Sequence, residues 1–252
     1  MELWLILPDI HDKHPERLSR KIYHPAVQCA EKVIQAYQPV GIMYLGDATD
    51  MESLCYFDRD KRILMEGRRY NKDIESLKHM LDRHEKIAPK SKRIYLMGNH
   101  EDRVRQYVEY HSEAEGQMDF ISDVGLVERG YEVIPYTDKN NFKKLGKASF
   151  MHGYDTSATH SAKMARTYQN SVFYGHVHDI QSTSAVNPQN DKEPRITASI
   201  GCLCDLNPRW MKNLPNKWLH GFGMFWLKSS GDFQMDVKVI VKGKTIINGK
   251  EF

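Results

Sequence analysis

Five short clusters of Asp, His and Asn residues are spread along the chain, and almost every one follows a short apolar run typical of a β-strand. The clusters are Asp9-Ile10-His11, Gly46-Asp47-Ala48-Thr49-Asp50, Gly98-Asn99-His100-Glu101, His152-Gly153 and Gly175-His176-Val177-His178. Loops at strand ends are where a sheet can bring polar side chains from distant parts of a chain to one place. Mixed oxygen and imidazole ligands suit divalent transition-metal ions. The pattern therefore predicts a metal site assembled at the ends of several strands.

Composition places the chain among ordinary globular proteins, because 40% of its 252 residues are hydrophobic and 27% are charged. This length allows one large domain or two small ones with a sizeable core. No apolar run approaches the roughly 20 residues of a membrane-spanning helix, so no membrane contact is expected. The apolar residues 1–7 lack the basic leader and cleavage site of a signal peptide, and we interpret them as the first core strand.

The four cysteines are too few for a disulfide scaffold in a chain of this length. Cys202 and Cys204 are separated by one residue, whereas the thiols of a usual zinc pair are separated by about two to four. We therefore expect reduced thiols in a cytoplasmic protein. The formal net charge of +3 is too small to indicate nucleic-acid binding on its own.

Apolar spacing predicts alternating strands and helices in the first half of the chain and mostly strands later. The expected strands are 2–7, 41–45, 93–97, 132–134, 148–151, 171–174, 196–200, 222–227 and 233–241. Helices are expected at 26–37, 74–87 and 161–168, with a mostly helical stretch at 101–128, an irregular insertion at 51–67 and a polar surface turn at 187–194. Helical crossovers followed by β-rich sequence predict an α/β fold with two packed sheets and helices on the outside.

Two divalent ions about 3.5–4 Å apart can hold both the attacking and the leaving oxygen of a phosphoryl displacement. One carboxylate must bridge such ions, and Asp47, directly after a strand, is the natural candidate. Asn99 can offer an amide oxygen without charge, and neutral imidazoles can ligate at His11, His152, His176 and His178. A water held between the ions would act as hydroxide near neutral pH. The clusters thus favour hydrolysis of a phosphate ester.

His100 is expected to stay off the metals, because it follows Asn99 directly and the two side chains leave the loop in different directions. If Asn99 faces a metal, His100 faces the substrate. There it could protonate the leaving oxygen or stabilise charge on the phosphoryl group.

The ordered series Asp-x-His, Gly-Asp-x-x-Asp, Gly-Asn-His-Glu, His-Gly and Gly-His-x-His, over residues 9–178, resembles the calcineurin-like metallophosphoesterase superfamily. The resemblance implies a four-layer α/β-β/α sandwich with two packed mixed β-sheets and a dinuclear centre. It assigns one metal to Asp9, His11, Asp47 and His178, the other to Asp47, Asn99, His152 and His176, and the catalytic role to His100. Manganese is the metal expected first, with iron, zinc, nickel or magnesium as alternatives.

Departures from the family pattern bear on the substrate. Protein phosphatases of this superfamily follow Gly-Asp-x-x-Asp with Arg-Gly, whereas Met51 and Glu52 follow Asp50 here, and they place an arginine where Met97 stands. Loss of two phosphate-gripping arginines weakens the case for a dianionic phosphomonoester, unless Arg103 turns inward. The segment 201–208, with Trp218 and residues 221–223, is similar to tails of phage and prophage phosphoesterases, which favours nucleic-acid chemistry in a bacterial or phage-infected cell.

Several residues carry two interpretations. Asp50 and Glu101 either touch the site or orient a ligand imidazole. His160 either lines the pocket or is a solvent-exposed helix cap. The basic and aromatic stretch 56–70 is either a groove for a nucleic-acid backbone or a solvated face in which Arg59 pairs with Asp58 and Asp60. The basic run Lys139, Lys143, Lys144 and Lys147 is expected to be a solvated loop.

These observations predict a single domain, 1–252, with a helical insertion at about 51–90. The predicted activity is dinuclear-metal-dependent hydrolysis of a phosphodiester, with DNA as the expected substrate, through attack of metal-bound hydroxide. A phosphomonoesterase acting on protein or a small molecule is one alternative. A non-catalytic, partner-binding scaffold of the same fold is the other. No oligomeric state is predicted.

Overall fold

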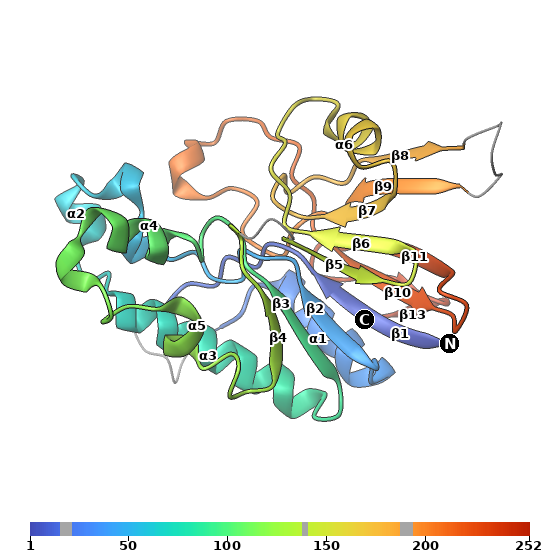
Figure 1. Cartoon of the computed structure of the whole chain (residues 1–252), viewed down its shortest axis with the longest axis horizontal. Helices are drawn as coiled ribbons and strands as arrows, with labels where there is room; N and C mark the ends of the chain where they lie inside the picture. Colours follow the sequence, from blue (N-terminus) through green and yellow to red (C-terminus); the bar gives the residue numbers. More distant parts are fainter. Residues whose placement is uncertain (16–21, 138–140, 187–193) are drawn as a thin grey trace.

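The computed structural model describes residues 1–15, 22–137, 141–186 and 194–252. Two large sheets dominate it, with strand orders β11-β10-β1-β2-β3-β4 and β5-β6-β7-β9-β8, and β12 pairs with β13 beside them (Figure 1). The strands are β1 (Glu2–Leu7), β2 (Gly41–Tyr44), β3 (Lys92–Leu96), β4 (Tyr131–Ile134), β5 (Phe142–Leu145), β6 (Ala148–Met151), β7 (Ser171–Tyr174), β8 (Ser182–Ala185), β9 (Arg195–Ser199), β10 (Gly221–Leu227), β11 (Phe233–Val239), β12 (Ile246–Ile247) and β13 (Lys250–Glu251). The helices are α1 (Pro25–Tyr37), α2 (Arg62–Met65), α3 (Tyr70–Ile87), α4 (Arg103–Tyr110), α5 (Phe120–Val124) and α6 (His160–Tyr168).

Strand β1 lies inside the six-stranded sheet, and its side chains alternate between two cores. Leu3, Leu5 and Leu7 pack against the helices on one face, whereas Trp4 and Ile6 pack toward the second sheet. Because both faces are buried, the strand is apolar throughout rather than alternating with polar residues. Strands β1 to β4 are parallel neighbours, and β10 and β11 extend the sheet antiparallel to β1.

The second sheet combines three parallel strands, β6, β7 and β9, with antiparallel β5 and β8 at its two edges. Met164 of α6 packs against Met151, Val172 and Tyr174 on the outer face of this sheet. Between the sheets lies a core that includes Phe150, Phe173 and Phe225 together with side chains of β1 and β2.

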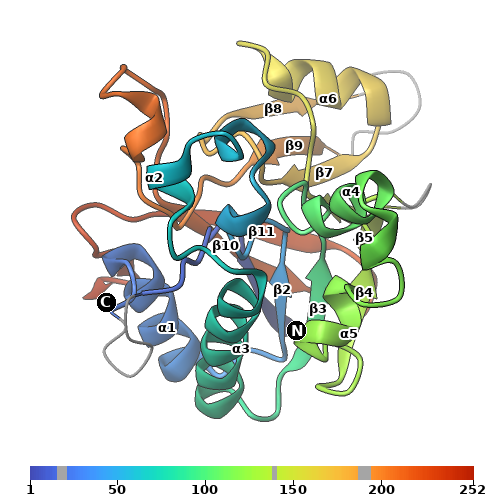
Figure 2. The same cartoon turned by 90° about the vertical axis from the view of Figure 1, so that its left-hand side faces the viewer.

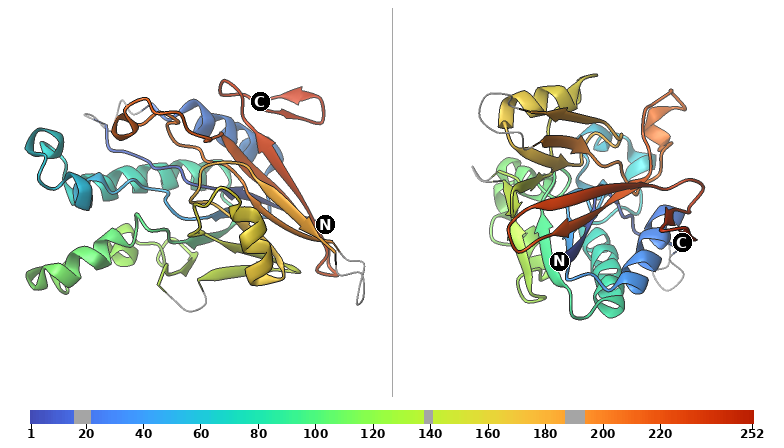
Figure 3. Two further views of the ribbon diagram at one scale, coloured as in Figure 1. Left: turned by 90° about the horizontal axis from the view of Figure 1, so that it is seen from above. Right: turned by 90° about the vertical axis from the view of Figure 1, so that its right-hand side faces the viewer.

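The layers therefore run from helices α1 and α3, through two packed mixed sheets, to α6 (Figure 3). This arrangement confirms the predicted α/β class with two packed mixed sheets. Strands β5 and β8 were not anticipated from the sequence, because their residues, Phe-Lys-Lys-Leu and Ser-Thr-Ser-Ala, show no apolar alternation. Lysines and small polar residues are typical of edge strands, which β5 and β8 both are.

Helix α3 belongs to the crossover that joins the parallel strands β2 and β3. On one of its faces, Ile74, Leu77 and Leu81 are buried in the core beside α1. Of the expected insertion at 51–90, only the part before α3 extends beyond the sheets. This part consists of 3₁₀ turns at Glu52–Leu54 and Tyr56–Asp58 followed by α2. It lies with α4 at one end of the molecule, beyond the strands (Figures 1 and 2).

Some sequence predictions concern residues that the structure does not describe. Lys139 and most of the expected turn 187–194 lie outside the described residues. All four cysteines are free, as expected, and three of them are buried. Within the described part of the chain, no helix has both the length and the apolar character that crossing a membrane requires.

Candidate metal centre

The predicted ligands gather at one edge of the two sheets, where the carboxyl ends of five strands meet. The strand ends that supply them are β1 for Asp9 and His11, β2 for Asp47, β3 for Asn99, β6 for His152, and β7 for His176 and His178. The carboxyl ends of parallel strands are where α/β sheets place ligand sites. The structure thus brings all seven predicted ligand residues together, and their role as ligands stays a prediction.

The backbone at this edge is strained in a way that aims the side chains. Asp9, His11, Asp47, His176 and His178 all have positive φ, at 29°, 47°, 48°, 69° and 61° respectively. Non-glycine residues rarely adopt this conformation, and it costs free energy that the surrounding structure must supply. Such outliers cluster at functional sites, and here they coincide with five of the seven predicted ligands.

Two glycines allow the ligand loops to approach one another. A Cβ atom at Gly98 would overlap Oδ1 of Asp47, and one at Gly175 would overlap Oδ2 of Asp9. Both carboxylates therefore occupy space that any other residue at these positions would fill. The Gly-Asn and Gly-His dipeptides of the sequence clusters have this steric reason.

Asp47 lies at the centre of the cluster and is almost fully buried. Its Oδ2 atom is 3.8 Å from Nε2 of His11 and 3.4 Å from Nε2 of His152. Among the described residues, two groups with metal-ligand spacing share this carboxylate: Asp9, His11 and Asp47, and Asp47, His152 and His176. The ligand atoms of each group lie within 4.8 Å of one another. This is the geometry that a bridging carboxylate between two ions requires.

The first half of the cluster holds Asp9, His11 and His178. Nε2 of His11 lies 3.1 Å from Nε2 of His178, and the latter atom lies 3.3 Å from Oδ1 of Asp9. Both oxygens of the fully buried Asp9 also accept a hydrogen bond from the backbone N–H of His176, at 2.9 Å. Two imidazole nitrogens and a carboxylate oxygen therefore converge on one small volume.

The second half holds Asn99, His152 and His176. Oδ1 of Asn99 lies 3.0 Å from Nε2 of His152 and 2.9 Å from Nδ1 of His176. Nδ1 of His152 donates to the carbonyl oxygen of Leu45 at 2.7 Å. When the ring is neutral, that hydrogen bond places its proton on Nδ1 and leaves the lone pair of Nε2 directed at the cluster, as a metal-ligating histidine requires.

The electrostatics of the cluster favour positive charge. Burial lowers the pKa of His152, but the carboxylates of Asp47 and Asp9 outweigh it and raise the pKa to about 10. Burial also lowers the pKa of His178, but the carboxylate of Asp9 outweighs burial and raises the pKa to about 10. The pKa of Asp47 is held well below its usual range, against the effect of burial, by His152, His100 and His11. The donor set thus fits divalent cations, which would replace protons on these nitrogens.

His176 contrasts with the other two, because burial and the neighbouring His152 lower its pKa to about 4. It is therefore neutral at physiological pH and available as a ligand without loss of a proton.

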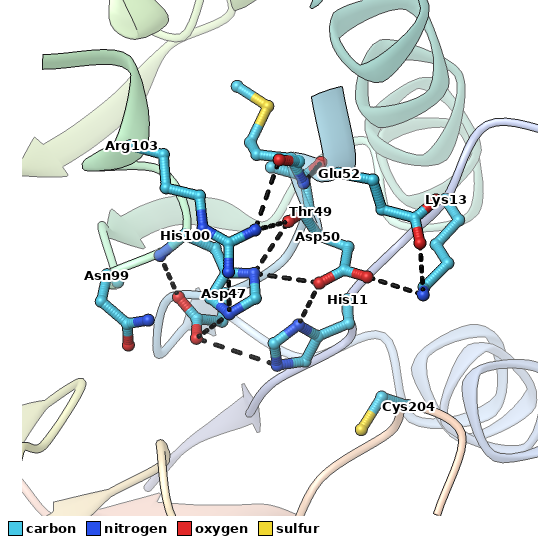
Figure 4. Close-up of polar contacts among 12 residues, drawn as sticks. His11, Lys13, Asp47, Thr49, Asp50, Glu52, Asn99, His100, Arg103 and Cys204 are labelled. Atoms are coloured by element: carbon cyan, nitrogen blue, oxygen red, sulfur yellow. Dashed lines mark hydrogen bonds and ion pairs between the residues drawn. The ribbon is translucent and has the colours of Figure 1, made fainter. Parts of the chain in front are cut away.

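His100 lies beside the cluster, with its ring 4.4 Å from the ring of His11 (Figure 4). His100, His11 and Asp50 also form a group with metal-ligand spacing, so the expectation that His100 stays off the metals remains a prediction. Its Nε2 atom is 3.8 Å from Oδ2 of Asp47 and 3.1 Å from Nη2 of Arg103. Burial lowers the pKa of His100, but Asp47 and Asp50 outweigh burial and raise it. A protonated imidazole next to the site could give a proton to a leaving oxygen.

Asp50 lies between two imidazoles and orients both. Its Oδ1 atom is 3.2 Å from Nδ1 of His11 and 3.0 Å from Nδ1 of His100, and Oδ2 pairs with Lys13 at 2.7 Å (Figure 4). Of the two interpretations drawn from the sequence, these contacts favour the orienting one. Arg103 turns inward, and its Nη1 atom donates to the carbonyl oxygen of Asp50 at 2.7 Å.

Glu101 is fully buried and ties two ligand loops together. Its carboxylate accepts from the backbone N–H groups of Asp47, Ala48 and Gly98 at 2.9, 2.8 and 2.7 Å. The hydroxyl of Tyr95 donates to it at 3.0 Å. Glu101 therefore positions the loops of Asp47 and Asn99 from behind the site.

His160 is in none of the groups with metal-ligand spacing, and the expectation of a solvent-exposed helix cap is wrong. Its side chain is buried, with Nδ1 at 2.6 Å from the Tyr174 hydroxyl and Nε2 at 3.0 Å from Asp179. The partners that bury it come from β7 and from the residue after His178, which the helical pattern alone does not reveal.

For residues 56–70, the contacts support the interpretation as a solvated face with ion pairs rather than as a groove for a nucleic-acid backbone. Asp58 pairs with Lys61 at 2.7 Å and with Arg68 at 3.0 Å, rather than with Arg59 as expected. Arg59 pairs with Asp60 at 3.6 Å, and its guanidinium covers the ring of Tyr56 at 4.1 Å. Most of its charges are thus already matched within the stretch.

Two further neighbours of the cluster, Cys204 and Trp218, were named in the sequence analysis for other reasons and not as contacts of a predicted ligand. Sγ of Cys204 lies 3.8 Å from Nδ1 of His178, and the ring of Trp218 lies 4.2 Å from the ring of His178. Both come from the loop between β9 and β10, which returns across β7, since the N–H of Leu219 donates to the carbonyl of His178 at 2.9 Å. Neither residue stands in a recognisable ligand pattern, so their contact with His178 could not be predicted from the sequence.

Comparison with known proteins gives distant likeness only. No protein-family model and no curated protein sequence matches the chain. A solved structure of Vps29 from Chaetomium thermophilum is 12% identical, with 96% of this chain and 100% of that one covered and a TM-score of 0.44. YfcE, a phosphoesterase from E. coli, is 16% identical over 97% of both chains, with a TM-score of 0.39. A conserved uncharacterized protein from Streptococcus pneumoniae TIGR4, described as a predicted phosphoesterase, is 10% identical over 100% of this chain and 97% of its own, with a TM-score of 0.35.

Proposed function

We propose that the chain is a metal-dependent phosphoesterase with a dinuclear centre. One ion would be held by Asp9, His11, Asp47 and His178, and the other by Asp47, Asn99, His152 and His176. The observation that carries this proposal is the position of the Asp47 carboxylate, which two of the four groups with metal-ligand spacing among the described residues share. Divalent transition ions are proposed because mixed imidazole and oxygen ligands suit them, and manganese is the first ion to test.

Bound ions of this kind would supply Lewis acidity toward a phosphoryl oxygen and a nucleophile derived from water. The chain's own groups do the rest. Asp50 holds the rings of His11 and His100 in place, and His100 carries the proton for the leaving oxygen. Arg103, whose Nη2 atom contacts Nε2 of His100, is placed to meet a non-bridging phosphoryl oxygen.

A phosphodiester is the preferred substrate, and DNA the preferred source. In the described part of the chain, Arg103 is the arginine that contacts this cluster. A diester carries one negative charge and needs fewer cationic partners than the dianion of a monoester. The inward turn of Arg103 is also the observation that keeps a phosphomonoesterase as the second candidate.

A comparison of substrates tests the proposal. The purified chain loaded with manganese is assayed on a bis-aryl phosphate, a mono-aryl phosphate, and single- and double-stranded DNA. We expect the diester to turn over faster than the monoester, and His100→Asn to slow both. Faster turnover of the monoester would make the chain a phosphomonoesterase. No turnover with any of several metals would leave a scaffold of the same fold.

A further inference from the structure

The loop between β9 and β10 contains a segment, residues 209–218, that we name the tryptophan arm. Its sequence is Arg-Trp-Met-Lys-Asn-Leu-Pro-Asn-Lys-Trp, with three cations, two tryptophans and no carboxylate. The arm starts with a 3₁₀ turn at Arg209–Met211. Drawn in orange, it lies at the same end of the molecule as α2 and α4, beyond the strands (Figures 1 and 2).

The arm leads from the metal centre to solvent through ring contacts. The ring of Trp218 meets the ring of His178 with centroids 4.2 Å apart, and Trp210 meets Trp218 with centroids 5.8 Å apart. Trp218 is half-buried, whereas Trp210 is 66% exposed. A large flat ring is therefore open to solvent two ring contacts away from a proposed metal ligand.

The arm is held in place by polar contacts rather than by the core. The side chain of Asn216 donates to the carbonyl of Leu206 at 2.8 Å and accepts from the N–H of Trp218 at 2.9 Å. The N–H of Leu219 then ties the end of the arm to the carbonyl of His178 at 2.9 Å. Trp218 is thus fixed relative to the metal centre while Trp210 stays accessible.

The cations of the arm have no ion-pair partner within the described part of the chain. Arg209, Lys212 and Lys217 are exposed, and none forms an ion pair with another described residue. Asp205, the closest carboxylate before the arm in the sequence, accepts from the N–H of Asn207 at 2.9 Å. The contrast with residues 56–70, where several cations are paired within the stretch, favours the arm as the surface that meets an anion.

We propose that the tryptophan arm is a binding platform for single-stranded nucleic acid, which seats the strand whose phosphodiester lies at the metal centre. An unpaired base stacks on Trp210, and the three cations neutralise phosphates that flank the scissile one. Exposed aromatic rings interleaved with cations are how proteins bind single strands without reading their sequence. Base pairs in a duplex hide their faces, so the platform acts on single strands. The placement of the bound strand, with its phosphodiester at the metal centre, rests on the proposed phosphodiesterase function.

The test measures binding and small-substrate turnover separately. Binding of fluorescein-labelled oligothymidylate, oligouridylate and a DNA duplex is followed by fluorescence anisotropy, without added metal and with EDTA. The variants are Trp210→Ala, Trp210→Phe, and the triple change Arg209→Gln, Lys212→Gln and Lys217→Gln. The matched controls are Tyr110→Ala, an aromatic side chain 82% exposed on α4, and Lys90→Gln, an exposed lysine before β3 at the opposite end of the sheet.

We expect Trp210→Ala to weaken binding of single strands about 10-fold, since one stacked base is lost, and to leave binding of the duplex unchanged. Trp210→Phe should recover most of the loss. The triple variant should reduce the slope of log affinity against log salt by about 2. Neither control should change binding, and turnover of a bis-aryl phosphate should stay within about twofold in the Trp210 variants, because that substrate does not reach the arm.

Unchanged single-strand affinity in Trp210→Ala would overturn the platform, whether or not the diester is hydrolysed. Equal weakening of single strand and duplex would also overturn it, because stacking would then not be the interaction. If the bis-aryl phosphate is not hydrolysed but Trp210→Ala still weakens single-strand binding selectively, the platform stands and the proposed activity fails.

Discussion

The Oδ2 atom of Asp47 lies 3.4 Å from Nε2 of His152, although β2 and β6 belong to different sheets. The candidate metal centre therefore exists only when the two sheets are packed against each other. The aromatic core between the sheets, with Phe150 and Phe225 in edge-to-face contact at 5.0 Å, sets that packing. The fold and the site are thus coupled through one interface.

Asp47→Asn should lower metal content and activity together. The amide keeps the shape of the side chain but loses the charge that a bridge between two cations needs. We expect fewer than two manganese ions per chain by elemental analysis after gel filtration, and a fall in diester turnover of more than about 100-fold. Asp60→Asn, at a carboxylate 92% exposed, is the control and should match the wild type. Full metal content in Asp47→Asn would contradict the bridging role.

His100→Asn should separate catalysis from metal binding. Both ions should remain, because His100 lies beside the cluster, while the rate falls by about 10²–10⁴-fold if the imidazole acts as a general acid. Elemental analysis and diester kinetics on one preparation check this. His111→Asn, at the end of α4, is the control. Loss of metal equal to that of Asp47→Asn would assign His100 to the ligands instead.

Glu101→Gln should destabilise the protein. The carboxylate accepts from four backbone N–H groups and the Tyr95 hydroxyl, whereas an amide can accept on one of its two atoms only. We expect the free energy of unfolding to fall by about 2–4 kcal/mol in urea titrations, because buried donors lose their partner. Glu109→Gln, at an exposed carboxylate, should change it by less than about 0.5 kcal/mol. Equal stability of wild type and Glu101→Gln would remove the role given to this network.

Metal binding should release protons, so that apparent affinity rises with pH. In the metal-free chain the pKa values of His152 and His178 are raised to about 10, and both imidazoles carry protons at neutral pH. Each proton displaced should raise the apparent affinity about tenfold per pH unit. Calorimetric titration of manganese in buffers of different ionisation enthalpy counts these protons. Affinity that does not change between pH 6 and 8 would count against both histidines as ligands.

The same histidines predict how the metal-free chain responds to pH. A folded-state pKa raised above 6.5 gives stability that is fully present below pH 6.5 and lost as pH rises toward 10. With EDTA, the melting temperature should therefore fall from pH 6.5 upward. His152→Gln should flatten this dependence, and an unchanged slope in that variant would refute the assignment.

Glu31, which lies away from the site, should make a contribution to stability that is lost in acid. Burial raises its pKa, but His84 and Arg83 outweigh burial and lower the pKa to about 2. Its contribution is present above pH 4.5 and is lost as pH falls toward 2. Because the Arg83 side chain is 46% exposed, we expect Glu31→Gln to cost about 1 kcal/mol at pH 7. The difference from wild type in urea titrations should narrow between pH 5 and pH 3, and a constant difference would show that the ion pair is not its source.

The sequence was sufficient for the parts of the fold that are buried on both sides. Strand β1 could be predicted because all its residues after Glu2 pack into one of two cores, which leaves an uninterrupted apolar run that ends next to Asp9. The same relation between apolar run and polar cluster holds for β2 with Asp47 and β7 with His176. Convergence of the seven predicted ligand residues followed from strand ends meeting at one edge.

What could not be predicted depends on contacts between segments far apart in the sequence. Strands β5 and β8 pair at sheet edges and carry no periodicity of their own. Burial of His160 depends on Tyr174 and Asp179. Cys204 and Trp218 reach His178 only because the loop between β9 and β10 returns across β7, a path that no local pattern encodes.

The most direct test of the bridging carboxylate is anomalous diffraction from crystals of the wild-type chain grown with manganese. We expect two anomalous peaks about 3.5–4 Å apart with the Asp47 carboxylate between them. His178 should ligate one ion and His152 the other. A single peak, or cations remote from Asp47, would contradict it.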